Sequence, residues 1–358
     1  MSAKIFENEE MKLLRSEDVN FNFNKKTGLM MTWGKTVEED PSYSPYGPFI
    51  ADIEVTTICN GVTGKDGKAS VCQFCYKSNT PNGINMSLED FKKVFHNLPR
   101  TITQIAFGAD SHATSNPDLF KMMEYCRNNN YNYVVPNITV AEISDETADK
   151  LAANCGACAV SRYSNKDVCY DTIKKLTDRG MTQVNIHIMI SDQTFDNVME
   201  TLQDRLVDSR LSKMNAIVLL SLKQKGRGKS FTSLSLEKFK QIVDFAITNN
   251  IAIGFDSCSA YKFLQSVKDH TNYKQYEMCA EPCESGLYSL YSNAEGKFFP
   301  CSFSEDTEGW FEGLDLKNCK NFLKDVWFHP KTVAFREKLL NTIKNNSIGC
   351  RECPLFKV

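Results

Sequence analysis

Two patterns of apolar and polar residues alternate along the middle of the chain. Between residues 48 and 258, short runs rich in β-branched and aromatic residues are each followed by a longer run whose apolar residues recur every three or four positions. The short runs have the composition of strands and the longer runs have the periodicity of helices. The expected strands are 49–57, 102–108, 131–139, 156–164, 183–191, 216–223 and 251–258. The expected helices are 87–98, 116–130, 144–155, 166–180, 194–208 and 235–250.

This order of elements predicts the class of the fold. A strand followed by a helix, repeated six or seven times, implies a parallel sheet joined by right-handed crossovers. Such a sheet is either open and doubly wound or curved into a full or partial barrel. Because about six units occupy about 200 residues, we expect an α/β protein in which residues 49–258 form a partial (β/α)6 TIM-like barrel.

The residues on either side of the expected barrel follow other patterns. Residues 1–48 contain a predicted hairpin around a Lys-Thr-Gly turn, followed by a linker rich in proline. Residues 259–358 contain six cysteines, short strand-like pieces and one final helical run. We therefore expect an N-terminal hairpin and linker, and a small, cysteine-rich α+β domain at the C-terminus.

Composition and charge restrict the function. With a formal charge of −2, the chain has no general attraction to phosphate backbones or anionic lipids, so we expect no nucleic-acid partner. No run is apolar enough to span a bilayer, and the N-terminal residues lack the apolar core of a signal peptide. We therefore expect no membrane association and a cytoplasmic location, where the 14 cysteines stay reduced and serve as ligands or reactive groups.

Three cysteines follow the first expected strand closely. Twelve residues separate Cys59 from Cys72, and two separate Cys72 from Cys75. Three thiolates do not complete a tetrahedral zinc site, but they can hold three irons of a [4Fe–4S] cluster and leave the fourth iron open to a ligand. A zinc site completed by His96 or His112 is the alternative. The position at the carboxyl end of a barrel strand, where active sites of such barrels lie, favours the cluster.

This arrangement resembles the radical SAM superfamily. The strand, the cysteine loop and Phe74 just before Cys75 match the family pattern, although the family's first gap is shorter than the polar one between Cys59 and Cys72. The resemblance implies a cluster on these three cysteines whose open iron binds S-adenosylmethionine (SAM), with Phe74 beside the cofactor. It implies an oxidoreductase or isomerase that uses a 5′-deoxyadenosyl radical, with an electron donor such as flavodoxin or ferredoxin as partner.

The same resemblance assigns further SAM contacts to residues after the second and fourth strands. Gly108, Ala109 and Asp110 stand at the turn whose backbone contacts the SAM amino group in the family. Ser161 and Arg162 stand where the family contacts the ribose or the carboxylate. An ordinary turn and a plain surface role are the alternatives.

The spacing of apolar residues adds a pocket residue on the fifth strand. Four β-branched residues alternate there with a more polar set that includes His187, and we expect the polar set to face the barrel interior. His187 is then a candidate cofactor-binding residue, or else a satisfied core histidine. Asp52 and Glu54 on the first strand are candidates for a cationic substrate group. The basic loop 223–230 is either a site for a carboxylate or phosphate or a solvated surface.

The C-terminal cysteines form a second pattern. Cys283 is followed by Gly296 and Cys301, and the chain closes with Cys350 and Cys353. These spacings resemble the SPASM and twitch extensions of radical SAM enzymes, and they imply one fully ligated auxiliary [4Fe–4S] cluster in a twitch domain. A zinc site built from the same four cysteines is the alternative.

The remaining thiols include two with candidate roles. Cys258, at the end of the last barrel strand, is either a buried core thiol or a catalytic hydrogen-atom donor, as in radical SAM epimerases. Cys279 stands four residues before Cys283 and is an alternative ligand to it. Cys155 and Cys158 form a C-x2-C pair that we assign to packing.

Three functions are compatible with these residues. In the first, a radical SAM enzyme modifies a peptide by epimerisation or cross-linking. In the second, a radical SAM dehydrogenase or epimerase acts on a small alcohol or sugar. In the third, from another class, a zinc- or iron–sulfur-stabilised protein binds a partner without catalysis. We expect the first, because twitch-type extensions are frequent among peptide-modifying relatives.

Overall fold

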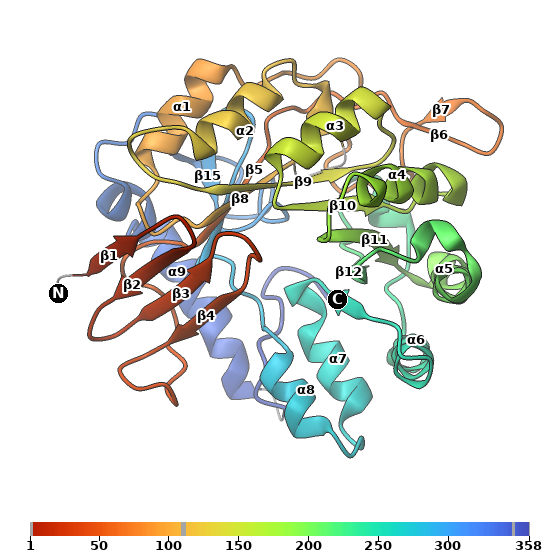
Figure 1. Ribbon diagram of the computed structural model, residues 1–358. Helices are drawn as coiled ribbons and strands as arrows, with labels where there is room; N and C mark the ends of the chain where they lie inside the picture. Colours follow the sequence, from red (N-terminus) through yellow and green to blue (C-terminus); the bar gives the residue numbers. More distant parts are fainter. Residues whose placement is uncertain (1–2, 109–111, 346–347, 358) are drawn as a thin grey trace.

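The fold is built on one large, curved sheet. The computed structural model describes residues 3–108, 112–345 and 348–357. Within them, seven strands run parallel to one another and form most of the sheet (Figure 1). In sheet order they are β13 (Ile253–Phe255), β12 (Ala216–Ser221), β11 (Val184–Ile190), β10 (Ala157–Ser161), β9 (Val135–Val140), β8 (Gln104–Phe107) and β5 (Ile50–Ile53). The prediction of an α/β fold with a large, mostly parallel sheet is confirmed, and within the described residues the sheet stays open at β13, which is consistent with a partial rather than a closed barrel.

Six helices connect these strands and cover the outer face of the sheet (Figure 1). They are α1 (Leu88–Asn97), α2 (Leu119–Arg127), α3 (Asp145–Asn154), α4 (Lys166–Asp178), α5 (Phe195–Val207) and α6 (Leu236–Thr248). Serine side chains at Ser87, Ser144 and Ser235 accept the backbone N–H three residues later and so cap α1, α3 and α6. These caps explain why the helices begin where the sequence predicts.

The alternation on β11 sorts its side chains between the two faces of the sheet. Val184, Ile186, Ile188 and Ile190 are buried in the main hydrophobic core, whereas His187 is only half-buried. Since successive side chains of a strand point to opposite faces, His187 lies on the inner face. The prediction that the polar set faces the barrel interior is therefore confirmed.

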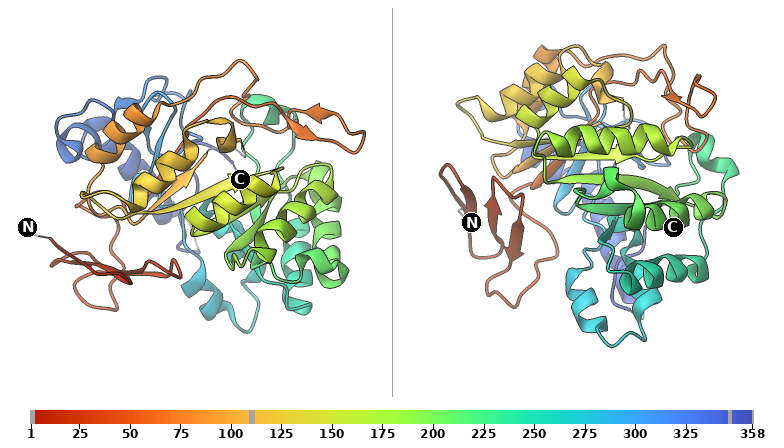
Figure 2. Two further views of the ribbon diagram at one scale, coloured as in Figure 1. Left: turned by 45° about the horizontal axis from the view of Figure 1, so that its top comes forward. Right: turned by 45° about the vertical axis from the view of Figure 1, so that its right-hand side comes forward.

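A separate four-stranded sheet precedes the barrel. It is an antiparallel meander of β1 (Lys4–Glu7), β2 (Met11–Arg15), β3 (Asn20–Asn24) and β4 (Met30–Trp33), and it lies against the side away from α4 and α5 (Figure 2). The hairpin of β3 and β4 was predicted, whereas β1 and β2 were not, because their charged residues hide the apolar alternation. Lys12 anchors this sheet, since its buried Nζ donates to Ile102 O and to Asn132 Oδ1, each at 2.5 Å.

The C-terminal residues extend the large sheet on its other side. β14 (Ser289–Ser292) pairs parallel with β5, and antiparallel β15 (Lys297–Phe299) and β16 (Leu314–Asp315) follow it. Three helices complete this part: α7 (Ala260–Val267), α8 (Tyr273–Cys279) and α9 (Pro330–Asn341). The boundary between residues 258 and 259 stays a prediction.

No helix in the described ranges is long and apolar enough to cross a membrane.

Candidate functional site

The three N-terminal cysteines lie on one loop beyond the carboxyl end of β5. Cys59 is buried, and Cys72 and Cys75 are half-buried. The thiols of Cys72 and Cys75 are hydrogen-bonded to each other, and Cys59 is close enough to act on Cys72 electrostatically. The structure therefore pairs Cys72 with Cys75 and places Cys59 within electrostatic reach of Cys72, while the role of the three thiols as one ligand set stays a prediction.

The surroundings of Cys75 favour its thiolate. The hydrogen bond from Cys72, followed by backbone N–H groups of Asn79, Ser78 and Lys77, lowers the pKa of the Cys75 thiol to about 6, against a burial effect in the other direction. The same pairing with Cys75, together with burial, raises the pKa of Cys72. Backbone donors aimed at a cysteine sulfur are the outer support that iron–sulfur clusters use, so this loop fits a cluster.

The cysteine loop, as the structure describes it, does not form a site for a single metal ion such as zinc. Among the residues that the structure describes, no three His, Cys, Asp or Glu side chains gather closely enough to hold one metal ion. In a [4Fe–4S] cluster each thiolate binds a different iron, so its ligands need not meet at one point. His96, one of the two predicted completing ligands of a zinc site, instead bonds through Nε2 to the Tyr125 hydroxyl at 2.6 Å and packs against Tyr131.

The basic loop after β12 packs directly on the cysteine loop. Its short 3-10 helix, Gly226–Ser230, places the Arg227 N–H on Cys75 O and the Arg227 Nε on Cys72 O, both at 2.9 Å. Glycines permit this approach, because a Cβ on Gly226 would lie 2.6 Å from Cys75 O. Sequence reasoning left this loop between an anion site and a solvated surface, and missed that it clamps the backbone of the cysteine loop. The Gly-Arg-Gly run was the available signal.

A cavity of about 350 Å³ adjoins the cysteine loop. Cys72, Phe74 and Arg162 line it, together with residues from β11 and Phe231. The Phe74 ring stacks on Tyr163 with centroids 5.9 Å apart and meets Phe231 edge-on at the same distance. Two of the predicted SAM contacts, Phe74 and Arg162, are thus brought to one cavity.

The other predicted SAM contacts lie on or just after strands β8, β10 and β11. Arg162 itself is buried, and its Nη2 pairs with Glu200 Oε2 at 2.9 Å. Ser161 closes β10 and lies in register with His187 on β11. Gly108 follows β8 with φ of +104°, a backbone conformation that favours glycine. Ala109 and Asp110 lie outside the described residues.

A buried ion pair lies inside the barrel, at the carboxyl ends of β12 and β13. Lys223 Nζ contacts Asp256 Oδ2 at 2.6 Å and is also hydrogen-bonded to the thiol of Cys258. Ser259 Oγ donates to the other carboxylate oxygen of Asp256 at 2.6 Å. Burial raises the pKa of Cys258 well above its usual value, although Lys223 opposes this. Sequence reasoning named Lys223 only as the first residue of the basic loop 223–230 and missed its pairing with Asp256, because no motif marks that pair.

His187 faces this same polar group. Burial lowers the pKa of its imidazole to about 4, and the negative charge of Asp256 acts in the opposite direction. The neutral imidazole is therefore the form that the interior of the barrel favours near neutral pH.

The four C-terminal cysteines of the second pattern lie near one another. Electrostatic effects connect Cys283 with Cys301, Cys350 and Cys353, and burial is the largest cause that raises the pKa of Cys283 to about 11. Cys279 is instead exposed at the end of α8. The geometry thus favours Cys283 over Cys279 as the partner of the other three thiols.

The expectation for Glu54 was wrong. This side chain is buried and pairs with Lys77 Nζ at 3.3 Å, and it accepts a hydrogen bond from the Tyr291 hydroxyl at 2.9 Å. Lys77 also pairs with Glu305, so Glu54 is occupied by the protein itself rather than open to a cationic substrate. Asp52 is not part of this network, and burial raises the pKa of its carboxyl to about 7.

Comparison with known proteins shows the fold. No protein-family model and no curated protein matches the sequence. The structure is similar to Streptococcus suis SuiB bound to S-adenosylmethionine, with a TM-score of 0.64 and 12% identity over 99% of this chain and 100% of that one. It is also similar to anSMEcpe with bound AdoMet, with a TM-score of 0.54 and 15% identity over 81% of this chain and 80% of that one. The chain therefore shares its fold with two proteins that were solved with SAM bound.

Proposed function

We propose that this chain is a radical SAM enzyme. The observation that carries the proposal is the meeting of Cys59, Cys72 and Cys75 on one loop beside a cavity lined by Phe74 and Arg162. The shared fold with two SAM-bound proteins supports it. A bound [4Fe–4S] cluster with SAM supplies one chemistry, the one-electron cleavage of SAM to a 5′-deoxyadenosyl radical that abstracts a substrate hydrogen.

The residues of this chain would hold and orient these groups. The thiolates of Cys59, Cys72 and Cys75 would ligate the cluster, and Arg227 fixes the loop that carries two of them through its bonds to Cys72 O and Cys75 O. Phe74 and Arg162 line the space beside them, and the apolar ring of Phe74 suits the adenosine of SAM, while the buried Arg162 guanidinium is paired with Glu200. Ser161 and His187 lie in register on adjacent strands, and neither is among the residues that line this cavity, so their contact with SAM stays a prediction.

The C-terminal cysteines are proposed to hold one auxiliary [4Fe–4S] cluster. Cys283, Cys301, Cys350 and Cys353 supply the four thiolates that such a cluster needs. Cys258 is linked electrostatically to Cys283 and Cys353 as well as to Lys223. A thiol in this position, at the end of β13, suits our proposal that it donates a hydrogen atom to a substrate radical.

The finer proposal is peptide modification, by epimerisation or cross-linking, with a flavodoxin or ferredoxin as the electron donor. A small alcohol or sugar is the second candidate, favoured by the compact polar group of His187, Lys223 and Asp256, which suits hydroxyl groups. In both reactions the site must exclude water around the reacting carbon, and the pair of buried Lys223 and half-buried Asp256 would supply fixed charge there.

The test is anaerobic reconstitution with iron and sulfide, followed by reduction, addition of SAM and detection of 5′-deoxyadenosine by mass spectrometry. We expect about eight irons per chain and 5′-deoxyadenosine from the unmodified protein. Cys75→Ser should lose about four irons and all 5′-deoxyadenosine. Cys319→Ser is the matched control, because Cys319 is a half-buried thiol outside both ligand sets. Zinc in place of iron, or an intact cluster that releases no 5′-deoxyadenosine, would leave the non-catalytic binding protein.

The auxiliary cluster has its own variant. Cys353→Ser should lower the iron content by about four per chain while 5′-deoxyadenosine is still formed. Equal iron contents in this variant and in the unmodified protein would contradict the second cluster without touching the first.

A further inference from the structure

Strand β13 leaves one side of its backbone unused. Ile217 N donates to Ala252 O, and Asp256 N donates to Leu219 O, both at 3.0 Å, so residues 252, 254 and 256 face β12. Because the backbone groups of alternate residues point to opposite sides of a strand, the N–H and C=O groups of Ile253 and Phe255 point away from the sheet. Within the described residues, no backbone hydrogen bond connects these two residues to another segment.

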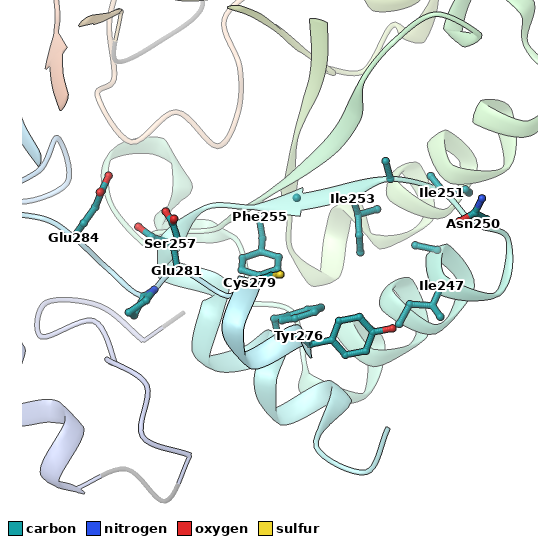
Figure 3. A pocket seen from close by; sticks show the side chains of 15 residues that line it. Ile247, Asn250, Ile251, Ile253, Phe255, Ser257, Tyr276, Cys279, Glu281 and Glu284 are labelled. Atoms are coloured by element: carbon teal, nitrogen blue, oxygen red, sulfur yellow. The ribbon is translucent and has the colours of Figure 1, made fainter. Parts of the chain in front are cut away.

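A cavity of about 710 Å³ runs along this open edge. Figure 3 shows it from Asn250 at one end of β13 to Ser257 at the other. Its apolar lining comes from β13 and from helices α6, α7 and α8 beside it. The large apolar and aromatic lining residues are Ile247, Ile251, Ile253, Phe255, Phe263 and Tyr276. Such a wall suits the side chains of an extended chain laid along the edge.

One end of this groove is acidic. Glu281 and Glu284 line it at the end near Ser257, as Figure 3 shows. Burial, followed by the charges of Glu281 and Asp52, raises the pKa of Glu284 to about 7 although Arg351 opposes this, so Glu284 is only partly ionised near neutral pH. In the part of the chain that the structure describes, no lysine or arginine forms an ion pair with either carboxylate. A positively charged ligand group would find complementary charge here.

The acidic end is also the end nearest the reactive residues. Ser257 lines the groove, and the next residue, Cys258, is hydrogen-bonded to Lys223 inside the barrel. A chain that follows β13 along its edge therefore runs towards Cys258.

We propose that the open edge of β13 binds the substrate as an added strand, and that this substrate is an extended peptide with a lysine or arginine side chain against Glu281 and Glu284. Main-chain pairing at a sheet edge is an established mode of peptide recognition. This inference rests on the proposed function and names its substrate class. The substrate would use the outward backbone N–H and C=O groups of Ile253 and Phe255. The backbone groups of a peptide have the same spacing as these groups, whereas a small alcohol has no such repeat.

The preference of the groove for a positively charged side chain is tested with two fluorescein-labelled nonapeptides of alternating threonine and valine. One peptide has a central lysine and the other has a central glutamate. Binding to the reconstituted protein is measured by fluorescence anisotropy at low salt. We expect the lysine peptide to bind about tenfold more tightly. The exposed residue Glu281 allows a charge swap, and Glu281→Lys should reverse the preference. Equal affinities, or no saturable binding of either peptide, would overturn the inference.

Main-chain pairing is tested with two N-methylated forms of the same lysine peptide, one methylated at the odd-numbered residues and one at the even-numbered residues. Only one of these two sets of N–H groups faces β13, so one methylated peptide should lose binding and the other should keep it. Ile253→Pro removes an outward N–H and should weaken binding, whereas Ile253→Val keeps that N–H and is the control. Equal binding of the two methylated peptides, or a dimer of this chain that occupies the edge, would contradict the added strand.

The inference and the proposed function fail differently. Formation of 5′-deoxyadenosine is measured in the same samples without peptide. If SAM is cleaved but the peptides do not bind, only the peptide groove is wrong. If the peptides bind with the expected preference for lysine and the expected sensitivity to N-methylation but no 5′-deoxyadenosine forms, the peptide groove is supported and the radical chemistry is wrong.

Discussion

His187 illustrates how a single position acquires its chemistry from its surroundings. An imidazole in water has a pKa near 6.5, and burial on the inner face of β11 lowers that of His187 to about 4. The folded state therefore holds this side chain neutral, while the unfolded chain takes up a proton between these two values. Asp256 opposes the shift but does not reverse it.

This shift predicts a pH dependence of stability. Above pH 6.5 both states are neutral at His187, so its contribution to the free energy of unfolding is constant. As the pH falls from about 6.5 to about 4, the unfolded state gains a proton that the folded state does not bind, so stability is lost by no more than about 3 kcal/mol. Below pH 4 the loss is complete.

The measurement is urea unfolding at a series of pH values for the unmodified chain and for His187→Gln, which is neutral throughout. The difference between the two curves isolates His187 from other titrating groups. We expect the unmodified chain to lose more stability than the variant between pH 6.5 and pH 4. Parallel curves would show that the histidine is solvated.

Among the elements, the 3-10 helix Gly226–Ser230 has the most direct effect on the proposed cluster site. It touches the cysteine loop through backbone atoms alone at Gly226, where φ is +55°. A methyl group there would lie 2.6 Å from the carbonyl oxygens of Cys75 and Tyr76. The backbone of the 3-10 helix and the backbone of the cysteine loop are therefore in close contact at Gly226.

Gly226→Ala should therefore push the two loops apart. We expect a loss of about 1–3 kcal/mol in the free energy of unfolding and a lower iron content after reconstitution, measured by urea unfolding and by iron analysis. Gly67→Ala is the matched control. Gly67 also has a positive φ, of +75°, and lies on the same cysteine loop, but no atom lies within 4 Å of its Cβ position. If both variants kept the same iron content, the contact at Gly226 would be irrelevant to the cluster.

At the scale of the whole molecule, one buried polar network joins the barrel to the C-terminal residues. Lys77 of the cysteine loop lies between Glu54 of the chain just after β5 and Glu305, and Tyr291 of β14 bonds to Lys77 Nζ at 2.8 Å. Removal of Lys77 would leave the buried carboxylate of Glu54 and the half-buried carboxylate of Glu305 without this charge partner.

Lys77→Met should therefore destabilise the protein by about 3–5 kcal/mol, measured by urea unfolding. Lys93→Met is the control, because Lys93 pairs with Glu89 on the exposed face of α1 and its loss should cost less than about 1 kcal/mol. Similar effects of the two substitutions would mean that the network is solvated and does not join the two parts.

The extension of the sheet predicts that residues 1–258 do not form an independent unit. β14 pairs with β5 from Ser289↔Ile50 to Ser292↔Ile53, so a chain that stops at residue 258 exposes the backbone of β5 as a new edge. We expect this fragment to aggregate or to lose cooperative thermal unfolding, followed by circular dichroism and light scattering. Cooperative unfolding at the temperature of the full chain would support separable domains instead.

Sequence reasoning was most successful where the cause is local. The periodicity of apolar residues predicted the parallel strands and the six helices between them, and three of these helices follow serines that cap them in the structure. The short gap between Cys72 and Cys75 was enough to predict their contact, since two intervening residues hold the thiols on one loop. The charged strands β1 and β2 were missed because their alternation is partly polar.

What the sequence determined by itself is therefore the order of the elements and the candidate ligands, because both depend on neighbours within a few turns of the chain. Only the tertiary structure decided which distant side chains meet them. Arg227 reaches Cys72 across 155 residues, and Tyr291 reaches Lys77 across 214. Pairings of this kind follow from how the strands curve and pack in three dimensions, and no local pattern of residues encodes them.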